Sequence, residues 1–207
     1  MTSCLWIGGA SDAGKTTQAR RLALVHTLAL LECDRRDAAE HERIAAASPS
    51  YRGFMDMSLE ERWVETTPER LLAHTLQTFA DRFPLILEDA RRLARRGRPV
   101  LVEGWDLLPD LVAPHIDDPR RAIWLLPSEA FKRRSWERRA KPSWRDQVSD
   151  PERAVANAFG RDLLLGEEIA RQAKANGFDT LLVDGSRSEA ALAALLDERF
   201  RPFLDSD

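Results

Sequence analysis

The sequence predicts an α/β fold in which a parallel sheet of five strands is covered by helices on both faces. Three observations predict it. Five short apolar runs lack polar alternation, as expected of strands buried on both sides. Stretches with the helical spacing of apolar residues separate these runs. The first run leads into a glycine-rich turn, residues 9–17, and a helical pattern follows it. Folds of this class bind ligands at the carboxyl ends of their strands.

The glycine-rich turn, here called the glycine loop, matches the pattern G-x-x-x-x-G-K-[ST] directly after the apolar run 4–7. Its glycines let successive N–H groups point at one phosphate, and a helix starting near Lys15 adds the positive end of its dipole. Lys15 is expected to reach the outer phosphates of a nucleoside triphosphate, and the Thr16 hydroxyl to bind Mg²⁺. The alternative is an ordinary strand-to-helix turn. The residues expected to bind phosphate are Gly9, Ala10, Ser11, Asp12, Ala13, Gly14, Lys15, Thr16 and Thr17.

Length and composition favour one domain, residues 1–207, with room for a mobile appendage. The chain has 207 residues, of which 43% are hydrophobic, so it can bury one substantial core. Its formal net charge of -3 gives no strong field for nucleic acid or for a membrane surface. The longest uncharged apolar stretch, 22–31, is too short to span a bilayer. Cys4 and Cys33 fall in predicted strands, and two cysteines of this kind fit a reducing cytoplasm.

A helix is predicted after the glycine loop because Ala19, Leu22, Ala23 and Val25 share one side of it. Residues 28–33 then form the second strand. The long stretch that follows, 34–97, has the pattern of helical hairpins. It begins with a helix over 37–47 and continues with a loop through Pro49, Tyr51 and Gly53.

Capping signals divide the rest of this stretch. Ser58 and Glu61 have the spacing of a capping box, and Thr67 followed by Pro68 is a typical helix start. The next predicted helix carries four apolar residues on one face, Leu72, Leu76, Phe79 and Phe83. Pro84 is expected to open a further helix, which Gly97 ends at the C′ position.

The second half of the chain continues the alternation. Strands are predicted over 99–104, 121–126 and 180–184. Ser128 is expected to cap a helix from Glu129 to about Arg139, and Asp150-Pro151 to open a long helix that ends before Gly177. Ser186 and Glu189 have capping-box spacing ahead of the C-terminal helix.

Three carboxylates follow predicted strands and would emerge near the glycine loop in a parallel sheet. Asp34 follows the second strand, Glu103 closes the third, and Asp106 lies just beyond it. Phosphoryl transfer needs one carboxylate near the magnesium ion and one that orients or deprotonates the attacking hydroxyl. The alternative for each is a local role, as a helix cap or a turn cap. Whether Asp34 or Glu103 is the base stays open.

Basic residues gather after the fourth strand. Guanidinium groups over a triphosphate would neutralise the transferring group and exclude water, whereas the alternative for any one of them is a solvated basic face. The cluster comprises Arg133, Arg134, Arg138, Arg139, Lys141, Arg145, Arg153 and Arg161. A set of aromatic and methionine side chains could line an acceptor pocket or simply fill the core. These are Tyr51, Phe54, Met55, Trp63 and Trp105.

Five features of the chain form a recognisable combination: the glycine loop, the carboxylate after strand two, Val102-Glu103-Gly104, the arginines on two successive helices and the closing run 183–186. In this combination the chain resembles the small P-loop kinases. That group of P-loop NTPases includes nucleoside monophosphate kinases, cytidylate-kinase-like enzymes, gluconate and shikimate kinases, and chloramphenicol-phosphotransferase-like proteins. The resemblance covers nearly the whole chain, and only the glycine loop is highly specific.

The resemblance implies a three-layer α/β/α sandwich with strand order 2-3-1-4-5. It also implies a helical acceptor-binding insertion over 34–97, a lid over 134–161, Gly185 and Ser186 beside the adenine, and Asp34 near the acceptor hydroxyl. The chain departs from the nucleotide kinases because Glu103 replaces their usual Asp and the run 105–107 has no arginine. These departures favour a less polar small molecule with a hydroxyl as acceptor.

The leading hypothesis is therefore phosphoryl transfer from ATP, with Mg²⁺, to a small-molecule hydroxyl. Thr16 and Glu103 are the expected metal residues, and Arg134 is also expected to touch the nucleotide. The expected oligomeric state is a monomer or homodimer, with no nucleic acid or membrane partner. The alternatives are a nucleotide-binding switch without an acceptor, and a fold member kept for protein interaction. The expected catalytic residues are Lys15, Asp34, Glu103, Arg134, Arg138 and Arg161.

Overall fold

The computed structural model describes residues 4–34, 38–139 and 142–204, and its core is one parallel sheet. The strands lie in the order β2-β3-β1-β4-β5, with every neighbouring pair parallel. The predicted fold class and the predicted strand order are both confirmed. The strands are β1 (Cys4–Gly9), β2 (Ala29–Glu32), β3 (Val100–Glu103), β4 (Ala122–Pro127) and β5 (Thr180–Val183).

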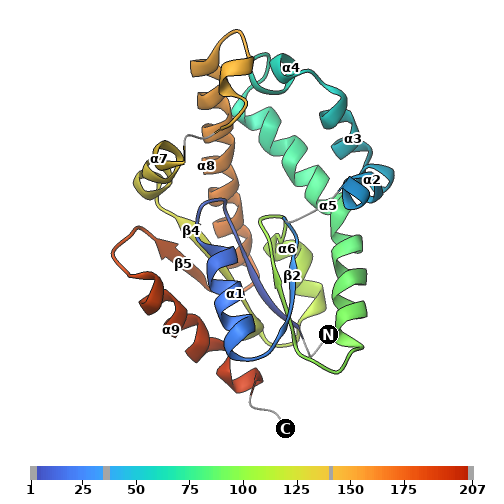
Figure 1. Cartoon of the computed structure of the whole chain (residues 1–207), viewed down its shortest axis with the longest axis vertical. Helices are drawn as coiled ribbons and strands as arrows, with labels where there is room; N and C mark the ends of the chain where they lie inside the picture. Colours follow the sequence, from blue (N-terminus) through green and yellow to red (C-terminus); the bar gives the residue numbers. More distant parts are fainter. Residues whose placement is uncertain (1–3, 35–37, 140–141, 205–207) are drawn as a thin grey trace.

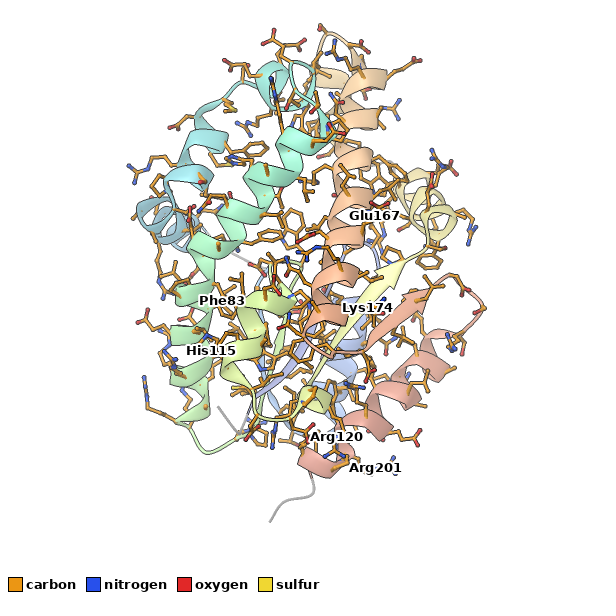
Figure 2. The ribbon with its side chains drawn as sticks, turned by 180° about the vertical axis from the view of Figure 1, so that it is seen from behind. Phe83, His115, Arg120, Glu167, Lys174 and Arg201 are labelled. Atoms are coloured by element: carbon orange, nitrogen blue, oxygen red, sulfur yellow. The ribbon has the colours of Figure 1, made fainter. Side chains whose placement is uncertain are left out.

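Helices cover both faces of this sheet. Alternate residues of β1 point to opposite faces, so Leu5 and Ile7 pack with α1 (Lys15–Val25) and α9 (Glu189–Phe200). Trp6 points the other way and packs with the cluster formed by α5 (Pro68–Ala94) and α8 (Pro151–Ala175), near α6 (Pro109–Val112). Figure 1 shows α1 and α9 in front of the sheet, and Figure 2 shows α5 and α8 in front of its other face.

Beyond the carboxyl ends of the strands, the helices continue past the sheet. The upper parts of α5 and α8 in Figure 1 carry three short helices and lie beside α7 (Glu129–Arg138). A separate apolar cluster, with Trp63, Leu71, Trp136 and Phe159 among its members, holds these parts together. The short helices are α2 (Ala38–Ala47), α3 (Pro49–Asp56) and α4 (Leu59–Trp63).

Most predicted helix starts are confirmed by their caps. Ser58 and Glu61 form a capping box at α4, and Thr67 accepts a hydrogen bond from the Arg70 N–H at the start of α5. Ser128 caps α7 and Asp150 caps α8 in the same way. These four caps set the entry angles of the helices that surround the carboxyl end of the sheet.

Three predictions about elements are wrong. Pro84 opens no new helix but lies inside α5, which continues through it with a solvent-exposed proline ring and changes direction along its length (Figure 1). Residues around Tyr51 form α3 rather than a loop, because Ser48 caps them and Pro49 occupies N1. The cap of α9 is Ser188, not Ser186, whose hydroxyl instead donates to Asp184.

The predicted helix end at Gly97 is also wrong by one residue. Gly97 has a positive φ of 77°, but α5 ends at Ala94, so the glycine lies beyond the C′ position. Within the described residues, no helix has both the length and the apolar character needed to cross a membrane.

Candidate functional site

The glycine loop connects the buried strand β1 to α1 at the carboxyl edge of the sheet. Gly9 has a φ of 125°, and a Cβ there would collide with the backbone of Leu125 on β4, so only glycine fits. Gly14 is the N-cap of α1 with a φ of 78°. The loop borders a cavity of about 360 Å³. Its lining residues are Ser11, Asp12, Gly14, Lys15, Thr16, Thr17, Arg20, Asp34 and Arg139.

Lys15 is buried beneath this cavity. Its ammonium donates to the Ala10 carbonyl at 3.0 Å, a contact that folds the side chain back along the loop. Burial lowers the pKa of Lys15, while the nearby charges of Asp34 and Glu103 act in the opposite direction. An ammonium so placed, at the N-terminus of α1, is suited to an anion at the loop.

Thr16 and Glu103 lie against each other at the carboxyl edge of the sheet. Glu103 ends β3, where it pairs in register with Ile7 of β1, so its carboxylate emerges beside the first turn of α1. The Thr16 hydroxyl donates to the two Glu103 oxygens at 3.1 and 3.3 Å. Glu103 is only 1% exposed. Two causes raise its pKa to about 7: the larger is loss of water on burial, and the smaller is the nearby charge of Asp34.

Asp34 lies two residues beyond the end of β2 and lines the same cavity as Lys15. Its carboxylate accepts a long hydrogen bond, 3.5 Å, from the Trp105 N–H. One side of Asp34 is open to solvent, and the other faces protein. Two causes raise the pKa of Asp34 to about 6: the larger is loss of surrounding water, and the smaller is the charge of Asp106. The carboxylate therefore titrates close to neutral pH, the range in which general bases operate best.

Asp106 is fully buried and belongs to a different pair. One of its oxygens lies 3.1 Å from the Arg82 guanidinium, which projects from α5 and is itself buried. Sequence analysis left Asp106 open between function and a turn cap, and the structure gives it a buried ionic partner. Asp106 thus acts on Asp34 through its charge and through the position of Arg82.

The donor set fits a magnesium ion that keeps most of its water. In the described parts of the chain, no group of three or more His, Cys, Asp or Glu side chains is arranged to hold a metal alone. Mg²⁺ at nucleotide sites is typically held by one or two protein oxygens together with phosphates and waters. One hydroxyl and one buried carboxylate, Thr16 and Glu103, provide such a pair.

The predicted arginines lie in different places. Arg134 donates to the Asp184 carbonyl at 3.2 Å and lies beside Gly185, where a Cβ would be 3.6 Å from its guanidinium. The structure thus places Arg134 against the turn that contains Gly185 and Ser186. Arg161 pairs with Asp162 at 2.6 Å, and its guanidinium lies 5.3 Å from the centre of the Trp105 ring.

Arg138 differs from its neighbour. Its side chain is exposed, and of these two arginines only Arg139 lines the cavity. Successive helical residues point about 100° apart, so the two neighbouring arginines face in different directions. The catalytic role expected for Arg138 stays a prediction. Lys141 lies outside the described residues.

Sequence analysis missed two buried basic residues near the site, Lys132 and Arg82. Lys132 is 1% exposed on α7 and pairs with Asp162 at 2.7 Å. Arg82 lies among the buried phenylalanines of α5. A charged residue on the apolar face of a helix was the available signal in each case, because such a residue requires a buried partner.

Comparison with known proteins gives a consistent fold. The structure is similar to shikimate kinase from Acinetobacter baumannii in complex with shikimate, with a TM-score of 0.53 and 15% identity over 98% of this chain and 93% of that one. It is also similar to thymidylate kinase from Candida albicans, with a TM-score of 0.50 and 14% identity over 97% and 91% of the two chains. The chain has the fold of the P-loop kinases. No family model matches it, and no curated protein sequence does.

Within the P-loop kinase fold, the glycine loop occupies the turn between β1 and α1, and the cavity lies at the carboxyl edge of the sheet. At such low identity the likeness concerns the fold. What the site does follows from its own residues.

Proposed function

We propose that this protein is a P-loop kinase that transfers a phosphoryl group from ATP, with Mg²⁺, to a hydroxyl of a small-molecule acceptor. One observation carries the proposal: Lys15 and Thr16 of the glycine loop share a cavity of about 360 Å³ with the carboxylate of Asp34. A phosphate-binding loop with a carboxylate opposite is the arrangement that transfer to a hydroxyl requires.

The nucleotide is held at two points. The loop from Gly9 to Thr17 receives the phosphates, with Lys15 exchanging the Ala10 carbonyl for a phosphate oxygen. Arg134, Gly185 and Ser186 form the other point, where the base lies against the turn after β5. In the proposed lid, residues 134–161, the arginines close over the transferring group.

The residues that would hold the magnesium ion are Thr16 and Glu103. Held by these two side chains, a divalent cation would supply positive charge to the phosphate oxygens. Glu103 must be ionised for this role. Its pKa is raised to about 7 in the ligand-free protein, and a neighbouring cation would lower it and favour the carboxylate form.

Asp34 orients the acceptor hydroxyl and receives its proton. A pKa of about 6 allows Asp34 to be ionised at neutral pH and still to accept a proton readily. The acceptor binds on the side of Asp34 formed by the insertion 34–97, where Trp105 and Arg161 lie close together. Arg161 is placed to approach the transferring phosphoryl from that side.

The test is ATP consumption by the wild-type chain, measured against a panel of alcohols, sugars, nucleosides and antibiotics. Acceptor-stimulated turnover that Lys15→Ala abolishes supports the kinase. Tight ATP binding without stimulation by any acceptor in the panel contradicts it and supports the nucleotide-binding switch. A chain that binds no nucleotide excludes both.

A further inference from the structure

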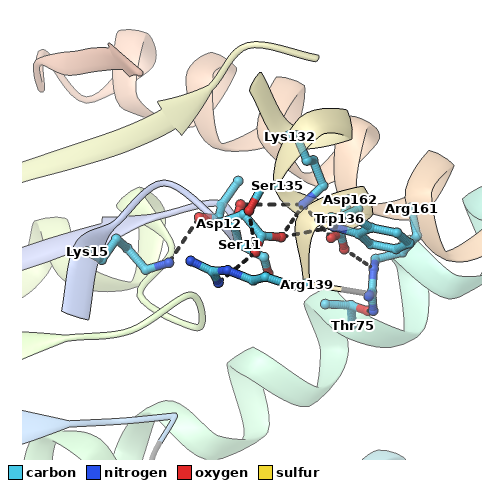
Figure 3. Close-up of polar contacts among 11 residues, drawn as sticks. Ser11, Asp12, Lys15, Thr75, Lys132, Ser135, Trp136, Arg139, Arg161 and Asp162 are labelled. Atoms are coloured by element: carbon cyan, nitrogen blue, oxygen red, sulfur yellow. Dashed lines mark hydrogen bonds and ion pairs between the residues drawn. The ribbon is translucent and has the colours of Figure 1, made fainter. Parts of the chain in front are cut away.

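The glycine loop contains a buried carboxylate, Asp12, and several donors from α7 and from the residue that follows it reach this carboxylate. Asp12 has a φ of 68°, unusual for a residue with a side chain, and the side chain is 1% exposed. Figure 3 shows donors from α7 converging on it. These are the Trp136 indole N–H at 2.9 Å, the Arg139 guanidinium at 3.1 Å, and Lys132 and Ser135, both at 3.4 Å.

Two of these donors are cations, and their surroundings differ. Lys132 is 1% exposed and lies between two acids, Asp12 at 3.4 Å and Asp162 at 2.7 Å. It is fixed inside the protein. Arg139 is 52% exposed, follows the last turn of α7 and lines the same cavity as Lys15. Of the two, Arg139 is the one that a ligand in the cavity can reach.

We propose that Arg139 is a phosphate-binding residue of this site and that Asp12 holds it at the glycine loop until a triphosphate takes the place of the carboxylate. The proposal rests on the proposed function, because it assumes that phosphates occupy the loop. Arg139 belongs to the basic cluster that the sequence singled out, and what the proposal adds is the exchange itself, which gives the loop's own acid a role.

The chemistry of the exchange is favourable. Carboxylate and phosphate oxygens accept the same guanidinium N–H groups, so Arg139 can pass from one to the other without changing its charge. An unpaired buried carboxylate would oppose the exchange. Here Lys132 and the Trp136 N–H stay with Asp12 after Arg139 leaves, so the loop retains a compensated acid.

The experiment measures the dissociation constant of the magnesium complex of a non-hydrolysable ATP analogue by calorimetry. Four chains are compared: wild type, Arg139→Ala, Asp12→Asn and the double variant. Arg139→Ala weakens binding about tenfold, because a charge-assisted pair with phosphate is lost. Asp12→Asn strengthens binding about threefold or more, because the competing carboxylate is gone. The gain from Asp12→Asn disappears in the Arg139→Ala background.

A matched control is Arg133→Ala, on the same helix. Arg133 is exposed and pairs with Glu129 at 2.8 Å, so its loss removes one positive charge from α7 without touching the cavity. Its affinity for the analogue stays within about twofold of wild type. Thermal melts of each variant show that it is folded.

The outcomes are distinct. Unchanged affinity in Arg139→Ala overturns the proposal, whatever Asp12→Asn does. Weaker binding in a folded Asp12→Asn chain overturns the holding role and makes Asp12 a support of the loop. A gain that persists in the double variant overturns the exchange, because it reflects only relief of repulsion between acid and phosphates. If the wild-type chain binds no analogue at all, the proposed function fails as well.

Discussion

At the level of single residues, Glu103 stands out because burial disfavours the ionised form of its carboxyl group. A group whose pKa is raised in the folded state stabilises the protein below its unfolded pKa and loses that contribution as pH rises through the folded value. For Glu103 the folded value is about 7 and the ordinary one 4.5. The ligand-free protein therefore loses stability as the pH rises from about 4.5 to beyond 7.

Glu103→Gln removes this loss. The glutamine side chain is uncharged, and its amide oxygen can still accept the hydrogen bond from the Thr16 hydroxyl. We expect the variant to melt about 5 °C above wild type at pH 8, and close to wild type at pH 5, by calorimetry without nucleotide. Glu168→Gln is the control of opposite sign, since the Arg171 partner lowers the pKa of Glu168 and its loss destabilises at pH 8. Equal shifts for Glu103→Gln at both pH values would refute this.

Asp34→Asn tests the proposed base. The amide is the same size but takes no proton, so kcat falls by about 10²- to 10⁴-fold while affinity for the ATP analogue stays within about twofold. In the wild-type chain kcat rises with pH through about 6, because the base works only when it is ionised. Steady-state rates from pH 5 to 8 measure both effects. An unchanged kcat in Asp34→Asn would remove Asp34 from the mechanism.

At the level of elements, α8 carries two glycines with different surroundings. A Cβ at Gly160 would lie 2.8 Å from the Pro68 ring, at the point where α8 crosses the start of α5. The proline ring is rigid and fixed at N1 of its helix, so the helices themselves would have to move. At Gly166 the nearest atom to a new Cβ is 4.0 Å away, which is ordinary contact.

Gly160→Ala and Gly166→Ala form a matched pair on one helix. The first destabilises by about 1–3 kcal/mol through overpacking. The second stabilises by about 0.5–1 kcal/mol, because alanine favours helix and restricts the unfolded chain. Urea unfolding of both variants measures the difference. Two variants with the same sign of effect would show that the close approach to Pro68 does not determine packing at this crossing.

The elements also show what sequence alone could predict. Apolar runs and capping residues were enough for five strands and four helix starts, because these signals are local. Pro84 misled because the surrounding packing holds α5 together through a residue that breaks isolated helices. Ser186 misled because Asp184, two residues away, competes for its hydroxyl.

The same division applies to the site. The turn between β1 and α1 was predictable because its pattern lies within nine consecutive residues. The partner of Thr16 required only that Glu103 end a strand. Lys132 is held by an acid in the loop and one on α8, so no local pattern identifies its role. Such pairs depend on how elements far apart in the sequence meet.

At the level of the whole molecule, the glycine loop joins the sheet to the helices beyond it. Asp12 connects the loop to α7, and Lys132 connects α7 to Asp162 on α8. Arg161, next to Asp162, reaches toward Thr75 on α5 at 3.5 Å. A ligand on the loop is therefore connected through these side chains to α7, α8 and α5.

Occupying the loop should stabilise the whole chain. At about 100 times its dissociation constant, the magnesium complex of an ATP analogue adds about 2.7 kcal/mol, which raises Tm by roughly 5–10 °C. Chelating the magnesium removes most of that increment, and Lys15→Ala abolishes it. Differential scanning fluorimetry measures each condition. A Tm increment that survives chelation unchanged would contradict the metal role of Thr16 and Glu103.

The hydrogen bond from Trp136 to Asp12 has a practical consequence. The fluorescence of an indole whose N–H donates to a carboxylate depends on the charge and the other partners of that carboxylate. The emission of Trp136 should therefore change when the surroundings of Asp12 change. The chain has six tryptophans, and replacing the others with phenylalanine where packing permits would isolate the signal. The fluorescence of Trp136 would then follow the binding and release of the proposed nucleotide in real time, without a dye or a coupled assay.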